Sequence, residues 1–429
     1  MTTVSMRIGV RLGNGLVVAA VAVDADGAVR QVLRADLPAR RSLTASVADA
    51  LRALDAHDQD VSAVVFDLSD PILRAPGRAV VSLRITPRRL PDRSEPHQVQ
   101  SASVHRAWVR GGHNALGEDL VGLDEDALRA VAGTIPAGAH LAVTAAGATV
   151  NPEHEHRAAE IVRAAVDLAA VTESHWFPVD SLHVREQTAI TNSALVSTAE
   201  ELTSRLGDAV RAVAPGARMF FSTTEGGAAP LTRLPDRPVH AIRATTANEL
   251  LGAAALVRRT EGPIGIVGAD GTHVGEMVAG VLSSRATTSL PDGTVLAVGS
   301  PHLLPLDDTS GHGAIDDLRL VDAERDGSEP LPTGIDLAAL GAAVAPVSTW
   351  YHRTEVVRTA ADVDRVLRAG ESAVRMTLVA AGASPAAVRF PESRVLGSSY
   401  GLAEVVHVRV RGVAGAAPAL LAPATGRAM

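Results

Sequence analysis

The sequence predicts an α/β protein of two to three domains, and three observations support this. The chain has 429 residues, which is more than one hydrophobic core usually organises. Apolar residues make up 46% and charged residues 21%, the balance of a globular protein. Residues 7–66 show the pattern strand, strand, strand, helix, strand, which combines both kinds of element in one unit.

The first unit begins with a predicted β-hairpin. Residues 7–22 form two β-rich runs separated by Gly13-Asn14-Gly15, and an Asn-Gly pair in this position is the strongest short hairpin signal. A turn then leads into a third strand, Val29–Asp36. Alanine and leucine at helical spacing predict a helix over Ser46–His57, and a strand follows over Val61–Phe66.

The rest of the chain continues to alternate helices and strands. Asp124 opens an acidic helix start, and Ile161, Ala165 and Leu168 share one face of a predicted helix. Residues 87–99 are rich in proline and arginine and are expected to form an exposed loop. The further predicted elements are helices 124–132, 155–168 and 199–213, strands 140–144 and 218–223, a strand pair over 262–279, a helix around 363–367, and strands 387–390 and 405–410.

Composition excludes several classes of function. The net charge of −8, with 2% aromatic residues, disfavours binding to nucleic acid or to an anionic membrane. The chain has no cysteine, which excludes disulfides, thiol catalysis and cysteine-bound zinc. It also has no lysine, so Schiff-base chemistry and a P-loop lysine are excluded. Neither a signal peptide nor an apolar run of the ~18 residues that span a bilayer is present, and we expect a cytoplasmic protein.

Two histidines form the polar group that most resembles a site. His113 follows a glycine pair, and His154 follows an Asn-Pro turn at the head of a helix. Each has a carboxylate close in sequence, Glu118 and Glu155, that is expected to orient the ring through its second nitrogen. His156 lies two residues from His154, and side chains two apart on a helix do not face one ligand. Nitrogen and oxygen ligands suit zinc or manganese, and we predict a divalent metal on His113 and His154. The alternative is that both are ordinary turn residues.

Two aspartates follow the strand over 61–66. Asp67 and Asp70 are predicted as catalytic carboxylates, either as the base or as oxygen ligands of the metal. Paired carboxylates in a loop also serve as solvated caps, and that reading stays open.

The motifs around the histidines resemble those of A-type hydantoinase and 5-oxoprolinase subunits. This family has a Gly-Gly-His turn, a "Gly-Glu…Leu-Asp" helix start and "Asn-Pro-x-His-Glu", which stand here at residues 111–113, 117–124 and 151–155. Weaker matches lie at residues 186–194 and 224–227, and the resemblance covers about residues 7–412. It implies an α/β fold with two RNase H-like domains, as in the actin and sugar-kinase ATPases, around a central cleft. The implied domains are residues 1–183, a shortened 184–412 and a flexible tail, 413–429.

The nucleotide-binding motifs of the family are altered in this chain. Arg11 stands where the family has an aspartate, and Gly15 where it has a threonine. In the second hairpin Gly268 replaces the aspartate. The backbone N–H groups of Gly-rich turns still suit phosphate, and the residues assigned to this role are Gly13, Gly15, Gly271 and Thr272. We expect no productive ATP binding, and plain structural hairpins are the alternative.

The resemblance implies hydrolysis of a cyclic amide of the hydantoin or 5-oxoproline type, here without ATP. It also implies a B-type partner subunit, or a homo-oligomer in its place. The altered motifs leave a second reading open, in which the chain is a noncatalytic scaffold or regulatory subunit of such a complex.

Overall fold

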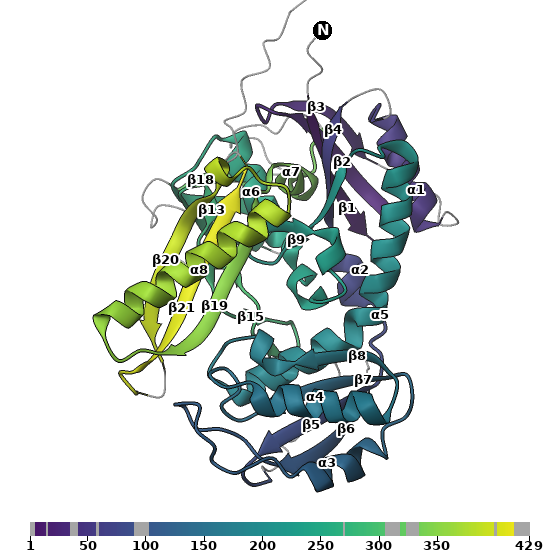
Figure 1. Ribbon diagram of the computed structural model, residues 1–429. Coiled ribbons are helices and arrows are strands. Elements are labelled where there is room, and N and C mark those ends of the chain that lie inside the picture. The colour runs from purple at the N-terminus through teal and green to yellow at the C-terminus, as the bar shows by residue number, and fades with distance from the viewer. Residues whose placement is uncertain are drawn as a thin grey trace, which may run out of the picture.

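The computed structural model describes residues 5–13, 16–34, 42–56, 60–89, 103–268, 271–304, 318–322, 334–398 and 401–415. Within these ranges the chain forms a mixed α/β structure with one nine-stranded sheet and two four-stranded sheets (Figure 1). Gly15 and the predicted tail after residue 415 lie outside the described residues. No described helix is both long enough and apolar enough to cross a membrane.

The first half of the large sheet has the predicted β-β-β-α-β order. Strands β1 (Met6–Gly13), β2 (Leu16–Asp24) and β3 (Val29–Arg34) are antiparallel, and β4 (Val61–Asp67) pairs parallel with β1. Helix α1 (Leu43–Ala53) begins three residues earlier than predicted, because Ser42 caps it by accepting from the Ala45 N–H. Strand β9 (Arg218–Thr223) then pairs parallel with β4.

A second unit is inserted in sequence between β4 and β9, and it lies at the bottom of Figure 1. Its parallel sheet has the order β6-β5-β7-β8 and a hydrophobic cluster of its own, while Val80 of β5 and Ala142 of β7 belong to the core that includes β1 and β4. The prediction that one helix runs to Leu168 was wrong: Val166 is extended, the helix ends, and Leu168 begins β8. The elements are β5 (Val80–Thr86), β6 (Val104–Arg110), α3 (Glu125–Ala132), β7 (Ala139–Ala145), α4 (Glu153–Ala165) and β8 (Leu168–Glu173).

Helix α5 (Leu182–Val213) connects this unit to the large sheet. The sequence predicted only its second half, from residue 199. The first half is buried but polar, so it lacks the apolar stripe that marks a surface helix. Several of its polar groups pair inside the protein: Glu186 pairs with Arg84 at 2.6 Å, and Asn192 donates to Thr172.

A second four-stranded sheet repeats the pairing of the first four strands. Its order is β13-β12-β11-β18, in which β11 is antiparallel to β12 and parallel to β18, as β1 is to β2 and β4. Its strands are β11 (Gly262–Gly268), β12 (Gly271–Val278), β13 (Val281–Leu282) and β18 (Arg319–Asp322). The predicted strand pair over 262–279 is thereby confirmed.

Helices α6 (Ala244–Leu256) and α7 (Leu337–Val344) join the two sheets. Helix α7 approaches both β1 and α6 so closely that only glycine fits at the contacts. A Cβ at Gly9 of β1 would lie 1.9 Å from the Ala339 carbonyl oxygen, and one at Gly341 would lie 1.7 Å from that of Asn248. The space beside β1 is therefore filled by α7.

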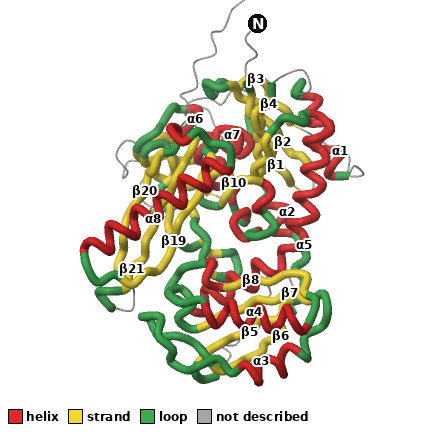
Figure 2. Tube along the Cα trace, in the orientation of Figure 1, coloured by secondary structure: helices red, strands yellow, loops and turns green. Residues whose placement is uncertain are grey.

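The C-terminal residues extend the large sheet on its other side. Strand β10 (Gly227–Pro230) pairs with β9, and β19 (Val347–Val356), β21 (Val405–Ala414) and β20 (Arg389–Gly397) follow in that order. Helix α8 (Ala360–Ala380), which starts with a capping box between Thr359 and Asp362, covers this part. Figure 2 shows loops gathered between the inserted unit and the rest. The short elements are α2 (Ser69–Arg74), the 3₁₀ turns η1 (Ser174–Trp176), η2 (Leu231–Arg233), η3 (Pro238–Ala241) and η4 (Pro385–Ala387), and strands β14 (Ser284–Arg285), β15 (Thr288–Ser289), β16 (Val295–Leu296) and β17 (Ser300–Pro301).

Candidate functional site

The structure brings the two predicted histidines together. His113 follows β6, His154 lies in the first turn of α4, and their rings stack with centroids 4.1 Å apart. A third residue that the sequence reasoning missed, Asp119, joins them: its Oδ1 lies 3.0 Å from His113 Nε2 and 3.6 Å from His154 Nε2. The sequence feature that could have identified Asp119 is its position in the same glycine-rich segment, six residues after His113.

The hydrogen bonds of this first group limit what it can bind. The Gly112 N–H donates to His154 Nδ1 at 2.9 Å, so Nδ1 is an acceptor and the proton of the neutral ring is on Nε2. His154 therefore has no lone pair left for a cation. No described residue hydrogen-bonds His113 Nδ1, and its Nε2 faces Asp119. Burial, together with the charge of His154, lowers the pKa of His113. His113 and Asp119 remain as two ligands, fewer than the three protein ligands of a catalytic zinc site.

The four carboxylates that the sequence associated with these histidines serve other contacts. Asp67, at the end of β4, is buried and accepts from the Ser69 N–H and from Asn248 Nδ2. Asp70 pairs with Arg74 on α2. Glu118 accepts from Asn114, not from His113. Among the described residues, neither Asp67 nor Asp70 joins a histidine group with metal-ligand spacing.

Glu155 does orient a histidine, but a different one from that expected. It is fully buried and accepts from Nδ1 and from the backbone N–H of His175, each at 2.9 Å. Burial raises its pKa, but the hydrogen bond from His175 and the charge of Arg185 outweigh this and hold the pKa below its usual range.

A second histidine group lies on the other side of the start of α4. His156, Glu173 and His175 each offer a ligand atom within 4.8 Å of the others. His156 Nδ1 lies 2.5 Å from Glu173 Oε2, and the two imidazole rings meet edge to face with centroids 4.7 Å apart. The spacing argument that separated His154 from His156 is confirmed, because each faces a different group.

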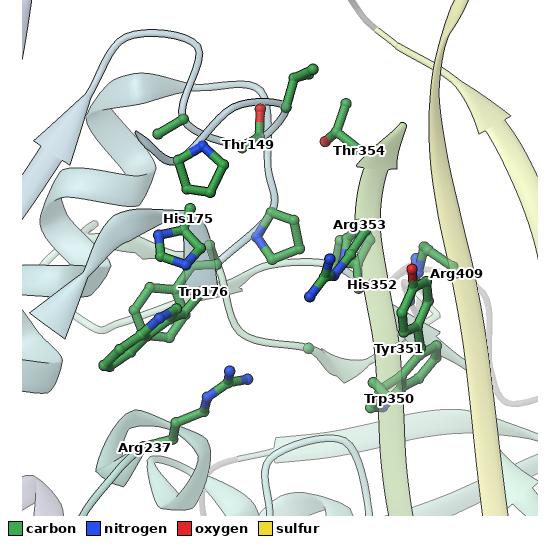
Figure 3. A pocket seen from close by; sticks show the side chains of 18 of the residues that line it. Thr149, His175, Trp176, Arg237, Trp350, Tyr351, His352, Arg353, Thr354 and Arg409 are labelled. Atoms are coloured by element: carbon green, nitrogen blue, oxygen red, sulfur yellow. The ribbon is translucent and has the colours of Figure 1, made fainter. Parts of the chain in front are cut away.

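His156 and His175 also line a cavity of about 640 Å³. It lies between the inserted unit and the large sheet, with η1 and the turn before α4 on one side and β19 on the other. Figure 3 shows the guanidinium groups of Arg237 and Arg353 reaching into it. Among the described residues no carboxylate lies within ion-pair distance of Arg237; burial, with the neighbouring Arg233, lowers its pKa to about 10.

Glu225 is a buried acidic residue on the wall of this cavity. Its Oε2 has no hydrogen-bond partner in the described part of the chain, and burial raises its pKa despite the nearby Arg411. The Arg411 guanidinium holds the turn in place by donating to the carbonyls of Glu225 and Gly226. Sequence reasoning noted the Thr-Glu-Gly-Gly turn only as a family match, so this residue was missed as a site residue.

The predicted nucleotide-binding residues lie at the ends of two hairpins. Gly13 ends β1, while Gly271 and Thr272 begin β12. Near the first hairpin Arg11 forms an ion pair with Asp336, with Nη1 and Oδ2 2.9 Å apart.

Comparisons with solved structures identify the fold. The chain is similar to an acetone carboxylase in a nucleotide-free structure, with 14% identity and a TM-score of 0.64 over 97% of this chain and 88% of the other. It is also similar to an ATP-dependent caprolactamase from Pseudomonas jessenii, with 16% identity and a TM-score of 0.67 over 96% and 88%. No protein-family model and no curated protein matches the sequence. At this identity the likeness shows the fold alone.

Proposed function

We propose that the chain is a hydrolase that opens a small cyclic amide, of the hydantoin or 5-oxoproline type, in the cavity beneath β19 and without ATP. The observation that carries this proposal is Glu225, a buried acid with a raised pKa on the wall of a cavity that also holds basic nitrogen atoms. Two solved structures of the same fold are titled as a lactamase and a carboxylase, and the sequence motifs resemble those of hydantoinase A subunits.

Amide hydrolysis needs two proton transfers, and the cavity offers a group for each. The leaving nitrogen must be protonated, and an acid whose pKa is raised keeps its proton closer to neutral pH. An attacking water must lose a proton, and His156 and His175 supply basic nitrogens on the same wall. Arg237 suits a carboxylate on the substrate, which favours the 5-oxoproline type over an uncharged ring.

The fold supports reading the chain as two RNase H-like domains about a cleft. The pairing β3-β2-β1-β4 recurs as β13-β12-β11-β18, with parallel and antiparallel pairs in the same places. In proteins with this arrangement nucleotide binds between the two hairpins. Here Arg11 and Asp336 pair beside the first hairpin and α7 packs on β1, which supports the proposal that ATP is not used.

The test is ring opening of 5-oxoproline and hydantoin, followed by chromatography, with the full chain alone and with any B-type subunit from the same cell. Glu225→Gln removes the proton donor without changing the shape, and turnover should fall by about 10²–10⁴-fold. Glu201→Gln makes the same chemical change on the exposed face of α5 and should keep full activity. Turnover that needs ATP would contradict the proposal, and no ring opening under any of these conditions would favour the scaffold reading.

A further inference from the structure

We propose that His156, Glu173 and His175 form a binding site for a divalent cation of the zinc class on the wall of the cavity. The three residues come from three elements, α4, β8 and η1, that meet at one edge of the inserted sheet. His156 lies in the first turns of α4, Glu173 ends β8, and His175 follows in η1. Nothing in the sequence motifs points to this group, because the spacing of 17 residues between His156 and Glu173 is bridged only by the fold.

The hydrogen bonds indicate which atoms would bind the ion. A carboxylate only accepts, so His175 Nδ1 must donate to Glu155 Oε2, and the lone pair of His175 is on Nε2. His156 Nδ1 donates to Glu173 Oε2, so a cation bound between these two atoms would replace the proton and take both as ligands. A ring such as that of His175, which donates one N–H to a carboxylate and offers the other nitrogen, is the arrangement in which histidine binds metals.

Glu155 makes the site rigid on one side. Besides the two groups of His175, it accepts from the Ala145 N–H at 2.8 Å and from Ser174 Oγ at 2.6 Å. Four donors on a fully buried carboxylate fix its position, and with it the orientation of the His175 ring. This is how a second carboxylate behind a metal-bound histidine usually acts.

The other side of the site is open. The His156 side chain is 51% exposed, and both rings border the cavity, so an ion and its bound water can enter. The ligand atoms lie within 4.8 Å of one another, whereas ligands about 2.1 Å from a tetrahedral zinc ion are about 3.4 Å apart. Rotation of the half-exposed His156 ring is the movement available to close this difference. With the cation bound, His156 and His175 would be its ligands and not the base; the cation would instead polarise an amide carbonyl in the cavity or lower the pKa of the attacking water.

The first histidine group does not offer this arrangement. His154 Nδ1 accepts from the Gly112 N–H, so its Nε2 carries the proton and is not a ligand. His154 and His156 therefore serve as a matched pair on the same helix, two residues apart, with opposite tautomers. A variant at one is the control for the other.

Metal binding tests the inference without any assay of activity. Protein freed of metal with a chelator is titrated with Zn²⁺ and with Mn²⁺ by calorimetry, and Co²⁺ is used to record visible absorption of the bound ion. We expect one saturable site per chain, at least about tenfold weaker in His156→Ala, His175→Ala and Glu173→Gln. Glu155→Gln should also weaken binding about tenfold, because it acts on His175 alone. His113→Ala and His154→Ala should leave the affinity unchanged.

Two results would overturn the inference: the absence of a saturable metal site, and a site that is lost in His113→Ala but kept in His156→Ala. Because His156 is half exposed, its alanine variant is expected to fold even if His175→Ala does not, and it decides the test alone. A metal site found in a chain that opens no cyclic amide would uphold this inference while the proposed function fails.

Discussion

The two histidine groups at the start of α4 have similar composition and different chemistry. Each joins two histidines to a carboxylate, and each has its three ligand atoms within 4.8 Å. In the first group a backbone N–H occupies a ring nitrogen of His154, whereas in the second both rings donate to carboxylates. The two groups therefore differ in which ring nitrogen carries the proton. His154 bonds to the backbone and supports the fold, whereas His156 and His175 bond to carboxylates and face the cavity.

If the cavity side carries the chemistry, Arg237 should determine which rings bind. 5-Oxoproline and 2-pyrrolidinone share one ring and differ by a carboxylate, which suits a guanidinium that pairs with no carboxylate in the described part of the chain. We expect Arg237→Leu to reduce the affinity for 5-oxoproline by about 10–150-fold, the loss of a charged hydrogen bond of about 1.5–3 kcal/mol. Binding of 2-pyrrolidinone should not change.

Calorimetry with the two ligands measures this preference. Arg211→Leu, on the exposed surface of α5, is the control and should bind as the wild type does. Equal binding of both rings by the wild type would argue against an acidic substrate and leave an uncharged cyclic amide.

The first histidine group should matter for stability instead. His154→Ala removes the acceptor of the buried Gly112 N–H, and an unsatisfied buried donor costs about 1–3 kcal/mol. Glu160→Ala, on the exposed face of the same helix, is the control and should change the free energy of unfolding by no more than about 0.5 kcal/mol. Urea unfolding of both variants measures the difference, and equal losses would show that the bond from Gly112 to His154 does not stabilise the fold.

The sequence was informative where structure depends on local pattern. It placed the first hairpin, the helices with an apolar stripe and the two turns that carry His113 and His154, because each depends on residues close in the chain. It did not find Asp119, Glu173 with His175, or Glu225 as site residues, because their roles depend on which elements end at the same edge. It also truncated α5, where polar residues such as Glu186 and Asn192 are buried against partners that only the fold supplies.

The cavity wall should also make the protein sensitive to acid. Burial, with Arg237, lowers the pKa of His240 to about 3, and burial, with Arg409, lowers that of His352 to about 3. The unfolded chain binds protons at these histidines near the ordinary pKa of 6.5, whereas the folded chain binds them only near pH 3. The free energy of unfolding is therefore highest above pH 6.5 and decreases as the pH falls toward 3. Each histidine contributes a slope of up to about 1.4 kcal/mol per pH unit in that window.

Unfolding by urea at several pH values between 7 and 4 measures this slope. The difference between wild type and His240→Gln, or His352→Gln, isolates each histidine from the other titrating groups, Glu225 included. The variants should lose less stability than the wild type as the pH falls, and parallel curves would show that these histidines are already protonated or exposed.

The smallest expected effect concerns ATP, and it compares the cavity with the hairpin ends near Arg11. Binding of Mg-ATP at a hairpin uses backbone N–H groups for the phosphates, one or two carboxylates for the metal ion, and open space for both. Here Arg11 is engaged by Asp336 at 2.9 Å, and Gly9 allows α7 to pack directly on β1. Asp67, the carboxylate opposite Arg11 in the register of β1 and β4, is held by Ser69 and Asn248. Calorimetry with Mg-ATP should therefore show no saturable heat, and the rate of ring opening should be the same with and without the nucleotide.

The variant Arg11→Ala tests whether charge or steric exclusion by α7 prevents nucleotide binding. It removes the ion pair but leaves α7 in place, so it should not create binding. Micromolar affinity in the wild type would show that the backbone N–H groups of the two hairpins are sufficient, and appearance of binding in Arg11→Ala would show that charge alone had excluded the nucleotide.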